Sequence, residues 1–97
     1  MHYHFEWDRF KARANVSKHG VTFDEAKSVF VDRWAIETHD REHSFDEERL
    51  LIIGMSDHNR LLTVAFTLRD FETIRIISAR RAKRNEENSY EETLRHR

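Results

Sequence analysis

The chain has 97 residues, 38% of them hydrophobic and 36% charged, with 17 Lys and Arg against 18 Asp and Glu. This length suits one small domain with a single core, so we predict one domain over residues 1–97. The sequence has no cysteine, which excludes disulfides, thiolate catalysis and thiolate metal sites. No stretch approaches the roughly 20 apolar residues of a membrane helix, and the start lacks the pattern of a secretory signal, so we expect a cytoplasmic protein.

The N-terminal third is expected to contain a short strand and two helices. Residues 2–7 read as the strand, and Asp8 is a plausible N-cap for a helix that runs to about His19. Gly20 would close this helix in a left-handed conformation. Thr22 and Glu25 then have the spacing of a capping box, and apolar residues at helical spacing follow. This pattern predicts a second, short amphipathic helix over residues 23–31.

The remainder of the chain is expected to supply a sheet and a final helix. Alternation around Ile36 predicts a strand, and residues 39–48 read as a polar loop. Three apolar runs, RLLIIGM, RLLTVAFTL and ETIRIIS, are separated by the short turns SDHN and RDF, which favours an antiparallel meander. Ser78 is expected to cap a last helix that continues through Tyr90. We therefore predict an α+β fold in which an antiparallel sheet packs with two N-terminal helices and a C-terminal helix.

A block of positive charge follows the last predicted strand. Five cations and no acid occur in residues 74–84, namely Arg75, Arg80, Arg81, Lys83 and Arg84. If Ser78 caps the helix, most of these side chains lie at its N-terminus, where the helix dipole disfavours cations. Free N–H groups and clustered arginines together would instead bind an anion, such as the phosphates of RNA or DNA. The alternative is a solvated helix face on which the cations pair with Glu86 and Glu87.

Four pieces of the sequence, in this order and spacing, carry a family resemblance. They are FEWD at 5–8, KHGVTFDEA at 18–26, EERLLIIG at 47–54 and RIISARRAKRNE at 75–86, with Tyr90 following. With these pieces the chain resembles the BrnT family of bacterial toxins over nearly all of its length. The resemblance implies a RelE-like fold and a ribonuclease activity that inhibits translation and growth. It also implies a BrnA-like antitoxin with a ribbon-helix-helix domain, through which the complex would bind operator DNA.

The resemblance further implies RNA cleavage without a metal or other cofactor, in which the RNA 2′-hydroxyl attacks the adjacent phosphorus. Such a reaction needs a base, an acid and cations that stabilise the phosphorane. The residues that we predict to be catalytic are Arg80, Arg81, His19, Glu48 and His43. Those that we predict to contact RNA phosphates are Arg75, Lys18, Arg49, Lys83 and Arg84.

Several of these residues also have a structural interpretation. The arginines can form surface salt bridges, His19 can be a C-terminal helix residue favoured by the dipole, and Glu48 can pair with Arg49. Tyr90, on the inner side of the last helix, can serve packing in place of catalysis.

Two other kinds of function stay open. His39, Asp40 and His43 can be interpreted as metal ligands of a metallonuclease, but the spacing suits a metal only if that segment is helical. The chain can also be a non-catalytic, nucleic-acid-binding regulatory module, whose basic residues would bind RNA without turnover.

Overall fold

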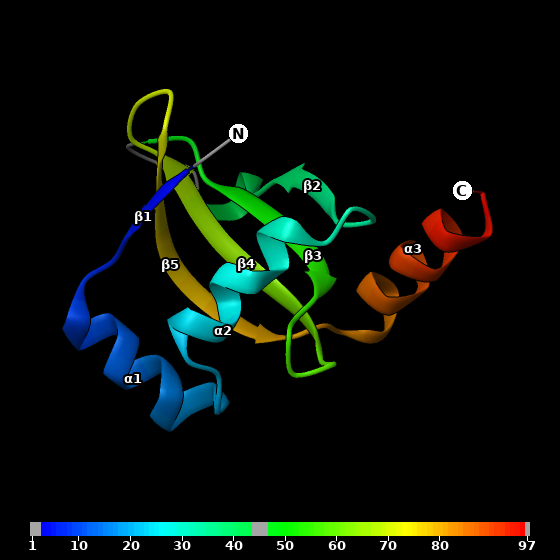
Figure 1. Ribbon diagram of the computed structural model, residues 1–97, viewed down its shortest axis with the longest axis horizontal. Helices are drawn as coiled ribbons and strands as arrows, with labels where there is room; N and C mark the ends of the chain where they lie inside the picture. Colours follow the sequence, from blue (N-terminus) through cyan, green and yellow to red (C-terminus); the bar gives the residue numbers. More distant parts are fainter. Residues whose placement is uncertain (1–2, 44–46, 97) are drawn as a thin grey trace.

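Five strands form one sheet in the computed structural model, which describes residues 3–43 and 47–96 (Figure 1). The strands are β1 (His4–Glu6), β2 (Ile36–His39), β3 (Leu50–Met55), β4 (Leu61–Leu68) and β5 (Thr73–Arg81), in the spatial order β1-β5-β4-β3-β2. The β2–β3–β4–β5 part is antiparallel, and β1 pairs with β5 in parallel. The helices are α1 (Arg9–His19), α2 (Phe23–Ser28) and α3 (Arg84–Arg95). The predicted α+β fold is therefore confirmed.

The local signals at the start of the chain act as predicted. Asp8 Oδ1 accepts hydrogen bonds from the backbone N–H groups of Phe10 (2.7 Å) and Lys11 (3.1 Å), which begins α1. Gly20 ends the helix with a φ of 69°, a left-handed conformation that glycine adopts without steric cost.

The second helix has only half of the predicted capping box. Thr22 Oγ1 accepts a hydrogen bond from Glu25 N at 3.0 Å, and α2 starts there. The side chain of Glu25 does not return to Thr22, because it turns inward to the guanidinium of Arg60. The helix ends at Ser28 and continues as a 3₁₀ turn, Val29–Val31, so the predicted segment 23–31 is helical in two parts.

Helices α1 and α2 cover one face of the sheet, and the core lies between them and the strands (Figure 1). Asn15 joins α1 to the sheet from a buried position: its Nδ2 donates to Val21 O (2.9 Å) and Ala79 O (2.8 Å), and its Oδ1 accepts from Ala79 N (3.0 Å). All polar atoms of this amide are thus used, as burial requires. The fully or nearly buried apolar residues include Phe23, Ala26, Val29, Ile52, Leu62, Val64, Phe66, Ile74 and Ile76.

The predicted helix start at Ser78 is wrong. β5 continues through Arg81, and α3 begins at Arg84 after the N-cap residue Lys83. The cause is tertiary: β4 is eight residues long, and its Thr63 and Leu62 pair with Arg80 and Arg81, which satisfies the backbone of those arginines as a strand. Arg80 and Arg81 are therefore strand residues and do not belong to the first turn of α3.

A β-bulge decides which side of the sheet each arginine faces. Phe66 pairs with Ile76 and Ala65 pairs with Ser78, so Ile77 is the extra residue. Strict alternation from Ile76 would place Arg80 on the core face. The bulge reverses this, so Ala79 is buried in the core and Arg80 lies on the other face.

Helix α3 is fixed near the end of β3 by a buried tyrosine. Tyr90 is 5% exposed, and its hydroxyl donates to Asp32 Oδ2 at 2.6 Å. Asp32 also accepts from Met55 N at 2.7 Å, at the end of β3. Burial raises the pKa of Tyr90 to about 12, and the hydrogen bond to Asp32 adds to the shift. None of the helices in residues 3–43 and 47–96 has the length and apolar composition needed to cross a bilayer.

Candidate active site

The sheet face opposite α1 and α2 carries a groove of about 700 Å³. Its floor is one row of side chains across four strands, because Thr38 pairs with Leu51, Leu51 with Ala65, and Ala65 with Ser78. The walls come from the segment that follows β2, from the start of β3, and from the end of β5. Their charged residues are Asp40, Arg41, Glu42, Arg49, Arg80 and Lys83, and His43 lies among them. The groove is therefore wide, polar and predominantly cationic.

Arg80 enters this groove from β5 as a fixed guanidinium. Its Nη1 and Nη2 donate to the two carboxylate oxygens of Glu86 at 2.8 and 3.0 Å, and Nη1 also donates to Arg81 O at 3.2 Å. Paired forks of this type are the strong, geometrically specific form of an ion pair. Glu86, and to a smaller extent Asp40, raises the pKa of Arg80. The carboxylate of Asp40 is thus within electrostatic reach of this guanidinium.

A histidine–aspartate pair lies in the same groove. His43 ends the 3₁₀ turn Arg41–His43, and its Nδ1 lies 3.0 and 3.1 Å from the two carboxylate oxygens of Asp40. The Asp40 side chain is 13% exposed, whereas that of His43 is 57% exposed. With Nδ1–H held by the carboxylate, Nε2 is the ring nitrogen left for proton transfer. The pair therefore has the arrangement of an oriented acid–base group.

The structure brings together only part of the predicted site. Arg80, His43, Arg49 and Lys83 line the groove. Arg81 lies on the opposite face of β5, in a separate hollow shared with Asn59, Arg60 and Glu87. Arg80 and Arg81, both predicted to be catalytic, therefore do not line the same groove, because neighbouring residues of a strand face opposite sides.

The other predicted site residues lie outside the groove. Arg75 is five residues before Arg80, about 17 Å away along the strand, and pairs with Glu6 at 2.9 Å. Lys18 and His19 belong to the last turn of α1, on the far face of the sheet. Glu48 is 3.4 Å from His39 Nδ1, and Arg84 is largely exposed on α3 beside Glu87.

Two residues, Asp40 in the groove and Glu86 beside it, make contacts that the sequence did not reveal. Asp40 was considered only as a metal ligand, although its spacing of three residues from His43 is a signal that a turn can bring them together. Glu86 was considered only as a surface partner for helix cations. Its contact with Arg80 depends on the chain folding back between β5 and α3.

The metal interpretation of His39, Asp40 and His43 required a helix through the segment, and that condition is not met. His39 is the last residue of β2, and only Arg41–His43 form a 3₁₀ turn. His39 and His43 contact different carboxylates, Glu48 and Asp40. Across the described ranges, no three His, Asp or Glu side chains are grouped as metal ligands.

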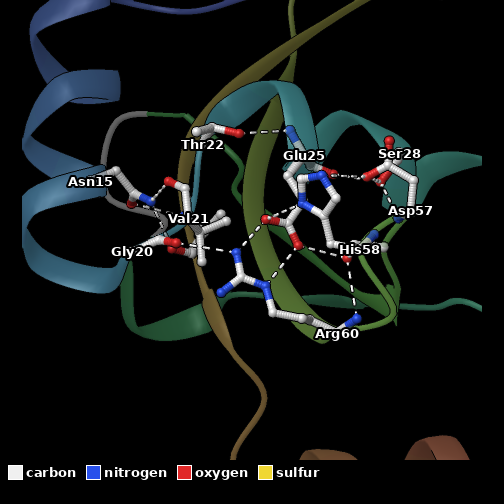
Figure 2. A network of polar contacts seen from close by, with 11 residues as sticks. Asn15, Gly20, Val21, Thr22, Glu25, Ser28, Asp57, His58 and Arg60 are labelled. Carbon is white, nitrogen blue, oxygen red and sulfur yellow. Dashed lines mark hydrogen bonds and ion pairs between the residues drawn. The ribbon is translucent and has the colours of Figure 1, made fainter.

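A second polar cluster lies away from the groove, where the β3–β4 turn meets α2 (Figure 2). Glu25 is only 3% exposed. It forms a fork with Arg60, accepts from Ser56 Oγ at 2.7 Å, and lies 3.0 Å from His58 Nδ1. Arg60 also donates to Gly20 O at 3.1 Å. These contacts tie the turn to the start of α2 and to the end of α1, so we interpret the cluster as structural.

Stability is expected to fall in acid because two carboxylates are held ionised. The Arg60 hydrogen bond outweighs burial and lowers the pKa of Glu25 from 4.5 to about 2. Burial raises the pKa of Glu86, but Arg80, Lys83 N and Thr63 outweigh it and lower that pKa from 4.5 to about 2. Both contributions are complete above about pH 4.5 and are lost as the pH falls toward 2.

Urea unfolding at a series of pH values tests this expectation. The free energy of unfolding should drop by roughly 1–3 kcal/mol per carboxylate across that window. Glu25→Gln should be less stable at neutral pH and show a shallower acid slope, whereas Glu91→Gln, on the exposed side of α3, should keep the wild-type slope. A wild-type stability that stays flat from pH 5 to pH 2 would contradict the assignment.

The fold and the groove together define a class: a small α+β protein with a cationic groove on one sheet face, suited to a phosphate-bearing ligand. A family model described as "Ribonuclease toxin, BrnT, of type II toxin-antitoxin system" matches residues 7–86, and the chain belongs to this family. Its fold is similar to the crystal structure of the Brucella abortus ribonuclease toxin BrnT, at 24% sequence identity and a TM-score of 0.65. That match covers 84% of this chain and 99% of the other. No curated protein matches the sequence.

Proposed function

We propose that the chain is a metal-independent endoribonuclease toxin whose active site is the groove of Arg80 and His43. The observation that supports this most is that a fixed guanidinium and an oriented histidine–carboxylate pair line the same groove. Arg49 and Lys83 add positive charge to the walls, where an RNA backbone would pass. The proposed site does not include Lys18, His19, Glu48, Arg75, Arg81 or Arg84.

The proposed reaction uses the nucleophile of the RNA itself. The 2′-oxygen forms a bond to the adjacent phosphorus, its proton passes to solvent in the open groove, and the bond from phosphorus to the 5′-oxygen breaks. Arg80 stabilises the charge on the phosphorane. Protonated His43 gives its Nε2 proton to the departing 5′-oxygen, while Asp40 stabilises the imidazolium and holds the ring. The products are a 2′,3′-cyclic phosphate and a 5′-hydroxyl.

The partner of this toxin is proposed to be a BrnA-like antitoxin with a ribbon-helix-helix domain. Membership of a type II toxin–antitoxin family supports a protein antitoxin. A segment of that protein over the groove would block phosphate access directly, and operator DNA would be bound only through the antitoxin. Cleavage that persists when the toxin is saturated with antitoxin would contradict this mode of inhibition.

Incubation of the purified protein with RNA in excess EDTA tests the activity. The proposal predicts cleavage that the chelator does not reduce, and growth arrest when the chain is expressed alone in the cytoplasm of a bacterium. The alternative function, a non-catalytic nucleic-acid-binding regulator, predicts RNA that is bound but intact after hours. A rate that falls with EDTA and returns with a divalent cation would identify a metal-dependent nuclease instead.

His43→Asn is expected to lower the single-turnover cleavage rate by about 10²-fold, the usual contribution of a positioned acid. Asp40→Asn should cost less, about tenfold, because the imidazole stays in place but loses its carboxylate. His96→Asn, the same substitution at an exposed position just after α3, is the matched control. Equal rates for His43→Asn and the control would exclude His43 as the acid.

A further inference from the structure

We propose that Glu86 is a positioning residue for Arg80, holding the guanidinium so that one defined edge faces the RNA phosphate. This inference rests on the proposed ribonuclease function. Glu86 contributes to catalysis through Arg80 and does not itself line the groove, whereas Arg80 does.

Hydrogen bonds from several groups hold the carboxylate of Glu86 in place. Besides the two bonds from Arg80, its Oε1 accepts from Thr63 Oγ1 at 2.9 Å and from Lys83 N at 2.8 Å. Thr63 is 3% exposed and is the register partner of Arg80 on β4. The Glu86 side chain is 11% exposed. A buried sheet residue and the first turn of α3 thus fix the carboxylate, and the carboxylate fixes the arginine.

The geometry of the fork determines what Arg80 can still bind. A guanidinium has five N–H groups, and the bonds to Glu86 and Arg81 O use both protons of Nη1 and one of Nη2. The Nε–H and the second Nη2–H, which lie along one edge, make no hydrogen bond to any of the described residues. Two parallel N–H groups on one edge match two phosphate oxygens. Glu86 therefore occupies the end of the guanidinium and leaves its side edge for the substrate.

The ion pair with Glu86 weakens the attraction of Arg80 for RNA but fixes the orientation of its guanidinium. Glu86 is ionised at neutral pH, so its charge offsets that of Arg80 and weakens the pull on RNA at a distance. The gain is that the bidentate edge is oriented before RNA arrives, and misplacement by about 1 Å can cost about 10²-fold in rate. Neutralising Glu86 should thus slow catalysis without weakening RNA binding, a combination that general destabilisation of the fold does not produce.

Glu86→Gln tests the proposal against Glu91→Gln, which makes the same charge change on the exposed side of α3. Glu86→Gln should lower the single-turnover rate by about 10–100-fold. Its Kd for a non-cleavable 2′-O-methyl RNA should stay within about threefold of wild type or become tighter. In an Arg80→Ala background the same substitution should have little further effect on the rate. An unchanged rate, or an equal loss in both backgrounds, would overturn the proposal.

A readout independent of catalysis separates this inference from the ribonuclease proposal. In a ¹H–¹⁵N spectrum, the Arg80 Nε–H signal should be sharp and distinct in wild type and in Glu91→Gln, and should collapse toward the exposed arginine signals in Glu86→Gln. If Glu86→Gln does not fold, Thr63→Val, which removes one donor to Glu86 at similar volume, should show the same changes to a smaller extent. An Nε–H signal unaffected by either substitution rules out positioning, whereas absence of cleavage by wild type rules out the ribonuclease.

Discussion

Replacing Arg80 with alanine is expected to lower the RNA cleavage rate by about 10²–10³-fold, the usual cost of removing one preorganised charge-stabilising group. Arg81→Ala should change the rate by less than about threefold, within the range of weak surface electrostatics. The two residues are adjacent and carry the same charge, but only Arg80 lines the groove. The two alanine variants are thus a matched test, because they have the same net charge and differ at adjacent positions of the chain. Single-turnover rates with saturating protein measure it.

A stability control and a second variant at position 80 make this comparison stricter. Arg80→Ala leaves Glu86 without its fork, so urea unfolding must show that the variant is folded under the assay conditions. Arg80→Lys keeps the charge but cannot present two parallel N–H groups, and we expect it to recover only a small part of the lost rate. If Arg81→Ala reduces the rate as much as Arg80→Ala, the groove is not the active site.

Arg60→Met is expected to cause the largest loss of stability, about 3–5 kcal/mol in the free energy of unfolding. Glu25 is 3% exposed in the wild type, and among the described residues its remaining side-chain partners would be Ser56 and His58 (Figure 2). A buried carboxylate that loses its cation must be protonated or hydrated, and both are costly.

Arg13→Met, on the exposed surface of α1, is the control and should cost no more than about 0.5 kcal/mol. Adding Glu25→Gln to Arg60→Met should recover part of the loss, because the unpaired charge is then removed. The cluster lies away from the groove, so the folded fraction of Arg60→Met should still cleave RNA. Equal stability of Arg60→Met and Arg13→Met would show that the Glu25–Arg60 pair contributes nothing net to the fold.

The parts of the fold that depend on local chemistry were predictable. Asp8 and Gly20 bound α1 because a cap and a left-handed glycine act within a few residues. The meander of β3, β4 and β5 followed from short connections between apolar runs. The helix start predicted at Ser78 was wrong. Serine is a common N-cap residue, but pairing with the long strand β4 continues β5 beyond Ser78.

The site was less predictable than the fold because it depends on a bulge and on long-range contacts. Residue type and resemblance predicted Arg80 and His43 as site residues, and both line the groove. Which arginine faces the groove is decided by the extra residue at Ile77, and no feature of the sequence marks that bulge. Glu86 became a partner of Arg80 only because the chain turns sharply after β5.

The most direct test of the central claim is cleavage, in excess EDTA, of two oligonucleotides that differ by one oxygen. One is all RNA, and the other has a 2′-deoxynucleotide at the position that the protein cuts. The account predicts that the RNA yields a 2′,3′-cyclic phosphate and a 5′-hydroxyl, and that the deoxy-substituted strand stays intact. Cleavage of the deoxy-substituted strand at that position, or products with a 3′-hydroxyl and a 5′-phosphate, would contradict it.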